Sequence, residues 1–157
     1  EGGTNKLAIK GTEEILDASD TQDYICCSVG TGGTIAGIIN TCDSMQQVIG
    51  FPAIKGSVDL LKDVRCWTNN KDFKFINSYS YGGYAKLTNV LLEFINEFYK
   101  TQNIPLDAVY TGKMMMGILD LVAKDYFPRG SSVLAIHTGG LQGNKGMSER
   151  LRVKLPS

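Results

Sequence analysis

The feature that most constrains this chain is a short, continuously apolar run at 24–29 (YICCSV), followed at once by a glycine-rich turn and an apolar helical pattern at 34–41. A strand without polar alternation is typical of a parallel sheet that is covered on both faces. Similar runs at 47–51, 73–76 and 132–137 alternate with segments of helical periodicity. This alternation predicts an α/β domain of three layers with a mainly parallel sheet.

Helical periodicity marks the segments between these strands. The clearest case is 88–101, where apolar side chains recur every three or four residues and share one face. An N-terminal helix is expected to begin after Thr4 and Asn5, which are suited to N-capping, and to be weakened by Gly11. The remaining expectations are helices at 6–18, 57–62 and 113–126 and a brief extended segment at 109–111.

Composition and charge exclude several classes of protein. The 157 residues suffice for one domain with a real core. Lys plus Arg and Asp plus Glu both number 16, so the basic excess of a nucleic-acid-binding or anionic-membrane-binding protein is missing. No apolar run approaches the roughly 20 residues that a membrane-spanning helix needs. We therefore expect no nucleic-acid partner and no membrane partner.

The cysteines indicate a reducing environment. Cys26, Cys27, Cys42 and Cys66 form no C-x-x-C pair, and His137 is the only histidine, so no metal site is expected. Reduced and mostly buried thiols are typical of a cytoplasmic protein, which is the location we expect.

The turn after the first strand is the strongest chemical feature, and it reads Gly30-Thr31-Gly32-Gly33-Thr34. The first backbone N–H groups of a helix have no intrahelical partner and the helix dipole is positive there, so a phosphate group fits. Adjacent glycines let an anion approach the backbone, and the two threonine hydroxyls can add donors. The turn is a candidate phosphate site, although a tight turn without a ligand would have the same sequence.

Two common nucleotide motifs fail on spacing at this turn. A G-x-G-x-x-G fingerprint that starts at Gly30 would need glycine at position 35, which is Ile35. A P-loop that starts at Gly32 reaches Gly37 but then needs lysine, and the residue is Ile38. These mismatches disfavour NAD and nucleoside triphosphates as ligands.

Several segments together resemble one enzyme family. The turn at 30–34 resembles the phosphate-binding loop of fold-type-II pyridoxal 5'-phosphate (PLP) enzymes, and 82–85 (GGYA) resembles a loop that places a tyrosine over the cofactor. The segment 107–117 (DAVYTGKMMMG) is similar to the motif D-P-V-Y-[TE]-G-K-x-M-x-G, and 137–140 (HTGG) to a closing H-[TL]-G-G. These motifs are those of the 1-aminocyclopropane-1-carboxylate deaminase and D-cysteine desulfhydrase family, whose fold is tryptophan-synthase-β-like. The segment 1–5 (EGGTN) looks like a part of the family that lies in mid-chain.

The resemblance implies a role for each matching residue. Tyr84 and Tyr110 match the two active-site tyrosines that face the substrate, and Thr111 stands where the family contacts the pyridine nitrogen. The cofactor-binding residues that it implies are, for the phosphate, Gly30, Thr31, Gly32, Gly33 and Thr34, and, for the ring side, Gly139 and Gly140.

The resemblance also implies that residues 1–157 are the C-terminal portion of a longer enzyme. The family's Schiff-base lysine lies in a G-N-K segment of an N-terminal half, which would be the chain's partner, and the full-length protein is expected to be a homodimer. A second G-N-K at 143–145 follows the last expected strand, so we expect a solvated loop there. Lys113 is expected on the surface at a helix start, and Met114 to Met116 in the core. The chain alone is expected to be inactive.

The residue at position 111 bears on the reaction. Deaminases of the group typically carry Glu there and desulfhydrase-like members carry Thr. A carboxylate keeps the pyridine nitrogen protonated, whereas a neutral hydroxyl does so poorly, which favours β-elimination over opening of a cyclopropane ring. We therefore expect a parent enzyme that converts D-cysteine or a similar β-substituted amino acid to pyruvate and ammonia. The alternatives are 1-aminocyclopropane-1-carboxylate deaminase, a non-catalytic module that binds a phosphate ligand, and an interaction protein without cofactor affinity.

Overall fold

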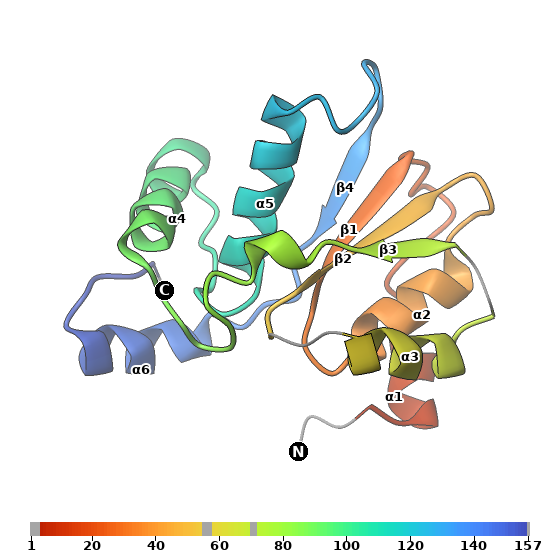
Figure 1. Ribbon diagram of the computed structural model, residues 1–157, viewed down its shortest axis with the longest axis horizontal. Coiled ribbons are helices and arrows are strands. Elements are labelled where there is room, and N and C mark those ends of the chain that lie inside the picture. Colours follow the sequence, from red (N-terminus) through yellow and green to blue (C-terminus); the bar gives the residue numbers. More distant parts are fainter. Residues whose placement is uncertain (1–3, 55–57, 70–71, 157) are drawn as a thin grey trace.

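The computed structural model describes residues 4–54, 58–69 and 72–156, and in them a four-stranded parallel sheet forms the centre of the fold (Figure 1). The strand order is β3-β2-β1-β4, and β1 pairs with β2 from Tyr24 opposite Gln47 to Val29 opposite Pro52. The predicted parallel α/β fold is therefore confirmed. The strands are β1 (Tyr24–Val29), β2 (Gln47–Pro52), β3 (Phe73–Phe75) and β4 (Val133–Ile136).

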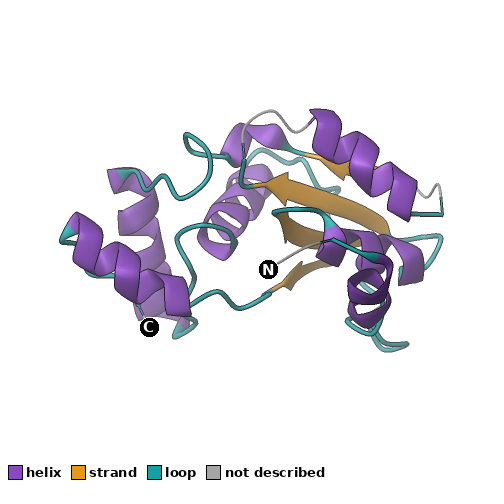
Figure 2. Cartoon of the chain, turned by 90° about the horizontal axis from the view of Figure 1, so that it is seen from below, coloured by secondary structure: helices purple, strands orange, loops and turns teal. Residues whose placement is uncertain are grey.

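Helices cover both faces of this sheet, as Figure 2 shows. On one face lie α2 and α3, with α1 packed on α2, and on the other lies α5. Beyond α5, away from the sheet, lie α4 and α6 (Figure 1). The described helices are α1 (Lys6–Thr12), α2 (Gly33–Thr41), α3 (Val58–Trp67), the 3₁₀ turn η1 (Asn77–Tyr79), α4 (Asn89–Gln102), α5 (Thr111–Ala123) and α6 (Gln142–Leu151). None of these helices has both the length and the apolarity needed to cross a bilayer.

Strand β1 supplies both halves of the core because successive side chains of a strand point to opposite faces. Ile25 and Cys27 pack against α2 and α3, while Cys26 packs against α5. Burial raises the pKa of both thiols to about 12, so they remain protonated and act as small apolar side chains. Cys42 is also buried, and Cys66 is exposed. The expectation that most of the thiols are buried is confirmed.

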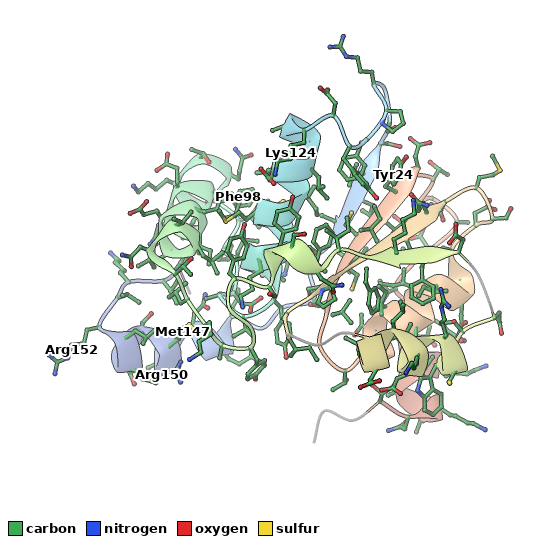
Figure 3. All side chains as sticks on the ribbon, viewed as in Figure 1. Tyr24, Phe98, Lys124, Met147, Arg150 and Arg152 are labelled. Atoms are coloured by element: carbon green, nitrogen blue, oxygen red, sulfur yellow. The ribbon has the colours of Figure 1, made fainter. Side chains whose placement is uncertain are left out.

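A third apolar cluster joins α4 and α6 to the segment before α5. Leu91 and Ile95 of α4 pack there with Met147 of α6. Figure 3 shows Arg150 and Arg152 at the outer edge of the molecule, beyond this cluster. Helices α4 and α6 are thus amphipathic elements whose apolar faces meet in this cluster rather than on the sheet.

The expectation of a solvated loop at 143–145 is wrong. These residues belong to α6, and Asn144 is only 2% exposed. Its amide oxygen accepts a hydrogen bond from the Ala108 backbone at 3.1 Å, and its amide nitrogen donates to the carbonyls of Leu106 and Pro156. A buried amide needs such partners, so Asn144 attaches α6 to the segment that leads into α5.

Other element boundaries differ for local reasons. Helix α1 ends at Thr12 rather than near residue 18, because the Thr12 hydroxyl donates to the carbonyls of Ile9 and Gly33 and so ties the chain to α2. Helix α3 continues to Trp67, beyond the predicted end at 62, and the predicted start at Ser57 lies outside the described residues. The predicted helix at 113–126 runs from Thr111 to Ala123.

A matched pair of glycine substitutions tests the packing of α1 on α2. A Cβ at Gly37 would collide with the side chain of Thr12 and lie 2.8 Å from the backbone nitrogen of Glu13, whereas a Cβ at Gly11 would meet nothing within 4 Å. Gly37→Ala should lower the free energy of unfolding by about 1–3 kcal/mol. Gly11→Ala should leave it unchanged or raise it by up to about 1 kcal/mol, since alanine favours a helix. Urea unfolding of both variants measures this, and equal effects would contradict the packing.

Candidate functional site

The glycine turn leaves an open helix N-terminus at the carboxyl end of β1. Gly32 is the N-cap of α2 and provides no side chain to bond the helix start. The first intrahelical bond runs from the Ala36 nitrogen to the Gly32 carbonyl at 3.0 Å, so the backbone N–H groups of Gly33, Thr34 and Ile35 precede the helical ladder. Backbone donors of this kind, with the positive end of the helix dipole, favour an anion.

Close packing explains why glycine occupies two positions of the turn. Gly32 has φ of +93°, and a Cβ there would lie 2.5 Å from a methyl carbon of Val64. A Cβ at Gly30 would lie 3.2 Å from the Tyr110 hydroxyl oxygen, because the Tyr110 ring lies against the turn. The predicted phosphate residues and one predicted catalytic tyrosine are therefore neighbours.

A cavity of about 340 Å³ opens at this junction. Its lining includes all five predicted phosphate residues and Tyr110, and also Thr4, Thr12 and Thr138, which the sequence reasoning did not assign to the site. The Thr4 hydroxyl is 3.1 Å from the Thr31 carbonyl and 3.0 Å from the Thr31 hydroxyl. The EGGTN segment, which resembles a part of the family, contains Thr4, but the sequence suggested only N-capping for this residue.

The two predicted catalytic tyrosines face one another. The rings of Tyr84 and Tyr110 have centroids 6.1 Å apart and meet edge to face at 64°. Tyr84 is 59% exposed, while Tyr110 is partly buried. Burial raises the pKa of the Tyr110 hydroxyl, and the neighbouring Tyr84 and Asp107 raise it further. Tyr110 therefore keeps its proton at neutral pH and can donate a hydrogen bond into the cavity.

Asp107 organises the start of α5. This residue begins the motif at 107–117, but the sequence alone gave it no role. Its carboxylate accepts hydrogen bonds from the backbone nitrogens of Val109, Tyr110 and Thr111 at 2.8 Å each, and from the Thr111 hydroxyl at 2.6 Å. These bonds fold residues 108–110 into a turn, so the extended segment expected at 109–111 is wrong. The same bonds set the position of Tyr110 at the N-cap of α5.

Thr111 is fully buried, and like Tyr84, Gly139 and Gly140 it does not line the cavity. Its hydroxyl donates to the Asp107 carboxylate and accepts from the Asp107 backbone nitrogen at 2.8 Å. The contact with a pyridine nitrogen stays a prediction.

The predicted ring-side glycines lie just beyond the cavity. Gly139 and Gly140 have φ of +84° and +93°, and a Cβ at Gly140 would lie 3.2 Å from the Asp107 carboxyl carbon. The Gly139 nitrogen donates to Nδ1 of His137, so Nε2 carries the ring proton and donates to the Pro105 carbonyl at 2.9 Å. The histidine thus fastens the segment after β4 to the segment before α5.

The expectation that Lys113 lies on the surface is wrong, because its side chain is only 2% exposed. Its ammonium group donates to the carbonyls of Ser80 at 2.8 Å and Gly83 at 2.6 Å. The loop that carries Tyr84 folds over the first turn of α5 and covers the lysine, which explains the burial. Met114 beside it is buried in the core, as expected.

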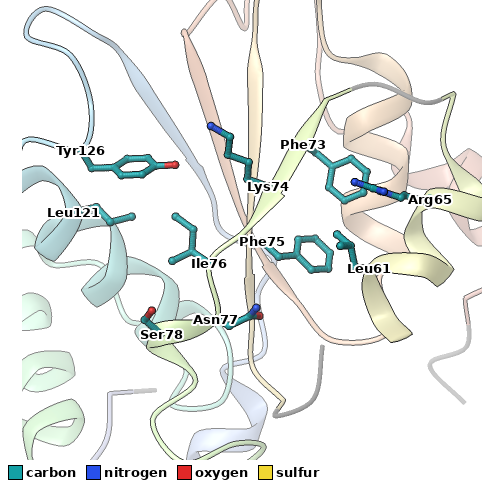
Figure 4. A pocket seen from close by; sticks show the side chains of 10 residues that line it. All are labelled: Leu61, Arg65, Phe73, Lys74, Phe75, Ile76, Asn77, Ser78, Leu121 and Tyr126. Carbon is teal, nitrogen blue, oxygen red and sulfur yellow. The ribbon is translucent and has the colours of Figure 1, made fainter. Parts of the chain in front are cut away.

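A larger cavity of about 640 Å³ lies along β3, between α3 and the end of α5 (Figure 4). Figure 4 shows Phe73, Phe75 and Leu61 on one side of it and Leu121 with Tyr126 on the other. It contains none of the predicted site residues. We therefore place the candidate site at the glycine turn, where backbone donors and the tyrosines converge.

Comparison with known proteins shows which family the chain resembles. No family model matches the chain. The chain is 33% identical to the 1-aminocyclopropane-1-carboxylate deaminase of Rhizobium radiobacter, over 83% of this chain and 43% of that protein. It is 31% identical to the mitochondrial bifunctional D-cysteine desulfhydrase/1-aminocyclopropane-1-carboxylate deaminase of Arabidopsis thaliana, over 90% of this chain and 41% of that protein. A crystal structure of a 1-aminocyclopropane-1-carboxylate deaminase homologue matches it with a TM-score of 0.75 at 25% identity, covering 92% of this chain and 48% of that one.

The fold is therefore that of the 1-aminocyclopropane-1-carboxylate deaminase homologue. By sequence as well, the chain belongs to the family of 1-aminocyclopropane-1-carboxylate deaminases and D-cysteine desulfhydrases, which confirms the resemblance seen in its motifs. The chain spans about half the length of the relatives that it matches. This partial coverage fits a C-terminal half.

The role of Asp107 can be tested by its removal. Asp107→Ala leaves three buried or partly buried backbone N–H groups without their acceptor, so the free energy of unfolding should fall by about 2–4 kcal/mol. Asp43→Ala is the control, because the exposed Asp43 carboxylate accepts one backbone bond, from Met45 at 2.9 Å, and its loss should cost less than about 1 kcal/mol. Urea unfolding measures both, and an Asp107→Ala effect no larger than the control would contradict the role.

Proposed function

We propose that this chain is the cofactor-phosphate-binding portion of a PLP-dependent enzyme that acts on small amino acids. The observation that carries the proposal is the convergence of the glycine turn, its open helix N-terminus and Tyr110 on one cavity of about 340 Å³. Membership of the deaminase and desulfhydrase family supports it.

The residues at the turn fit the phosphate of PLP. The N–H groups of Gly33, Thr34 and Ile35 precede the first helical bond and are not capped by a side chain. The described lining of the cavity is rich in glycine backbone and threonine side chains and includes no Asp or Glu, so no carboxylate among the described residues repels an anion there. Phosphate groups bind helix N-termini of this composition through backbone donors and hydroxyls.

The chain's own residues then hold and orient the reacting molecule. When bound, PLP supplies an electron sink for the bonds at the α-carbon of an amino acid. Tyr110, whose pKa burial raises, stands against the turn as a protonated donor, and the exposed Tyr84 stands beside Tyr110. In the proposal, the two hydroxyls face the substrate and move or hold a proton there.

The neutral residue at position 111 favours elimination as the reaction class. Thr111 offers no carboxylate to keep a pyridine nitrogen protonated, and its hydroxyl proton is directed to Asp107. An elimination needs less electron withdrawal by the ring, since a leaving group takes the electrons away. The proposed reaction is D-cysteine plus water giving pyruvate, ammonia and hydrogen sulfide. The second candidate is 1-aminocyclopropane-1-carboxylate deamination, which the name of the Rhizobium radiobacter relative supports.

Three parts of the proposal lie outside this chain. The lysine that bonds the cofactor would come from an N-terminal half, the complete enzyme would be a homodimer, and it would reside in the cytoplasm. The length of the relatives, about twice that of this chain, supports the first of these. Expressed alone, residues 1–157 should show no turnover.

Thr34 tests the phosphate site. Thr34→Val removes a hydroxyl at the cavity but keeps the shape of the side chain, so the affinity of the full-length protein for PLP should fall by about tenfold. Thr41→Val, at the other end of α2, is the matched control, because the Thr41 hydroxyl is bonded to the Gly37 carbonyl and does not line the cavity. Titration with PLP measures both variants. Equal affinities would place the phosphate elsewhere.

Substrate preference separates the candidate reactions. The full-length protein with PLP should convert D-cysteine faster than 1-aminocyclopropane-1-carboxylate, as measured by kcat/KM from the release of ammonia, which both reactions produce. The reverse preference would support the deaminase alternative. PLP binding without turnover of either compound would indicate a non-catalytic module, and the absence of PLP binding would indicate an interaction protein that kept only the scaffold.

A further inference from the structure

Lys113 is a buried charge for which the proposed chemistry has no use. It stands in the first turn of α5, where the helix dipole disfavours a cation, and it is only 2% exposed. Burial lowers the pKa of its ammonium group, and the Asp107 carboxylate offsets part of that effect. A methionine would fill the same space without this cost. The lysine is therefore best explained by what its ammonium group binds.

The ammonium group binds the loop that carries Tyr84 at two points. It donates to the carbonyls of Ser80 and Gly83, and each carbonyl also accepts a bond within the loop. The Gly83 nitrogen donates to the Ser80 carbonyl at 3.0 Å, and the Lys86 nitrogen donates to the Gly83 carbonyl at 3.3 Å. The ammonium group thus bonds the carbonyl that begins each of two consecutive turns, 80–83 and 83–86. Tyr84 lies in the second turn.

This loop has an unfavourable backbone conformation that needs an external anchor. Tyr81 and Ala85 have φ of +46° and +52°, a region that non-glycine residues rarely adopt, and Gly82 and Gly83 have φ of +95° and +108°. Such a segment persists only when surrounding contacts over-determine it. The two bonds from Lys113 are contacts of that kind, and they come from the helix that begins beside Tyr110.

We propose that Lys113 is a positioning residue, whose buried ammonium group holds the Ser80–Lys86 loop so that Tyr84 stands against Tyr110. The inference rests on the proposed function only in taking these two tyrosines as the catalytic pair. The position of the loop can be measured without cofactor. Failure of PLP binding and failure of this proposal are therefore distinguishable.

Hydrogen exchange of the full-length protein that contains this chain is the first test. In Lys113→Met, the amides of Gly83 and Lys86 should exchange at least roughly tenfold faster than in the parent, while those of β1 and α2 should not change. Lys124→Met is the matched control, because Lys124 follows the end of the same helix and makes an exposed pair with Asp120 at 2.6 Å. Equal loop exchange in the two variants would overturn the proposal.

The coupling of Tyr84 to Tyr110 is the second test, one that a purely structural lysine would leave unchanged. Burial raises the pKa of Tyr110 and the Tyr84 neighbour raises it further, so Tyr84→Phe should lower it. Loss of the Lys113 charge by itself raises the pKa of a nearby tyrosine, so the effect of Tyr84→Phe is compared in the parent and in Lys113→Met. Because the loop is released, Tyr84→Phe should lower the pKa less in Lys113→Met than in the parent, and Lys113→Arg, which keeps the charge and the donors, should restore the difference in part. Tyrosinate absorbance, taken as the difference from each protein's Tyr110→Phe variant, reports the value, and an equal effect of Tyr84→Phe in the two proteins would overturn the proposal.

A second substitution covers the case in which Lys113→Met does not fold. Lys113→Gln is neutral and shorter, so it loses the charge that strengthens the bonds to the two carbonyls. Faster exchange at Gly83 or Lys86 in this variant would support the anchor, and unchanged exchange at both would overturn it.

Discussion

The carboxylate of Asp107 is the interaction on which the candidate site depends. It accepts four hydrogen bonds from three consecutive residues, and it therefore decides where α5 begins and where the Tyr110 side chain points. The cost of burying a carboxylate is offset only when its acceptor capacity is filled in this way. A Cβ at Gly140 would lie only 3.2 Å from the Asp107 carboxyl carbon, so the segment after β4 packs onto Asp107 as well.

The site also depends on the direction of the sheet. Because the strands of the described sheet are parallel, the carboxyl ends of β1 and β4 lie at the same edge, and the turn after β1 meets Thr138 after β4 in one cavity. The segment before α5 packs in the apolar cluster with α4 and α6, and the N-cap of α5, Tyr110, lies at that edge. Three segments that are far apart in the sequence therefore contribute to one small volume. A glycine turn alone would bind an anion without orienting anything beside it.

Much of the fold could be predicted from the sequence, because local patterns determine it. Strand β1 matches its predicted bounds, and α4 begins one residue after the predicted start, with Thr88 as its cap. The errors concern residues whose partners are distant in the sequence. Lys113 bonds to carbonyls 30 and 33 residues away, and Asn144 to atoms of residues 12 to 38 residues away. Lysine and asparagine are usually exposed, so no periodicity marks the few that a distant loop will cover.

The alternation of side chains along β1 has a consequence for the thiol chemistry of the protein. Cys26 and Cys27 are neighbours in the chain but point into different layers of the core, and Cys42 is buried as well. Cys66, near the end of α3, is exposed. Within residues 1–157, an alkylating dye would therefore react at α3, on the sheet face opposite α5, and a fluorophore attached there would report on that layer from outside the lining of the cavity.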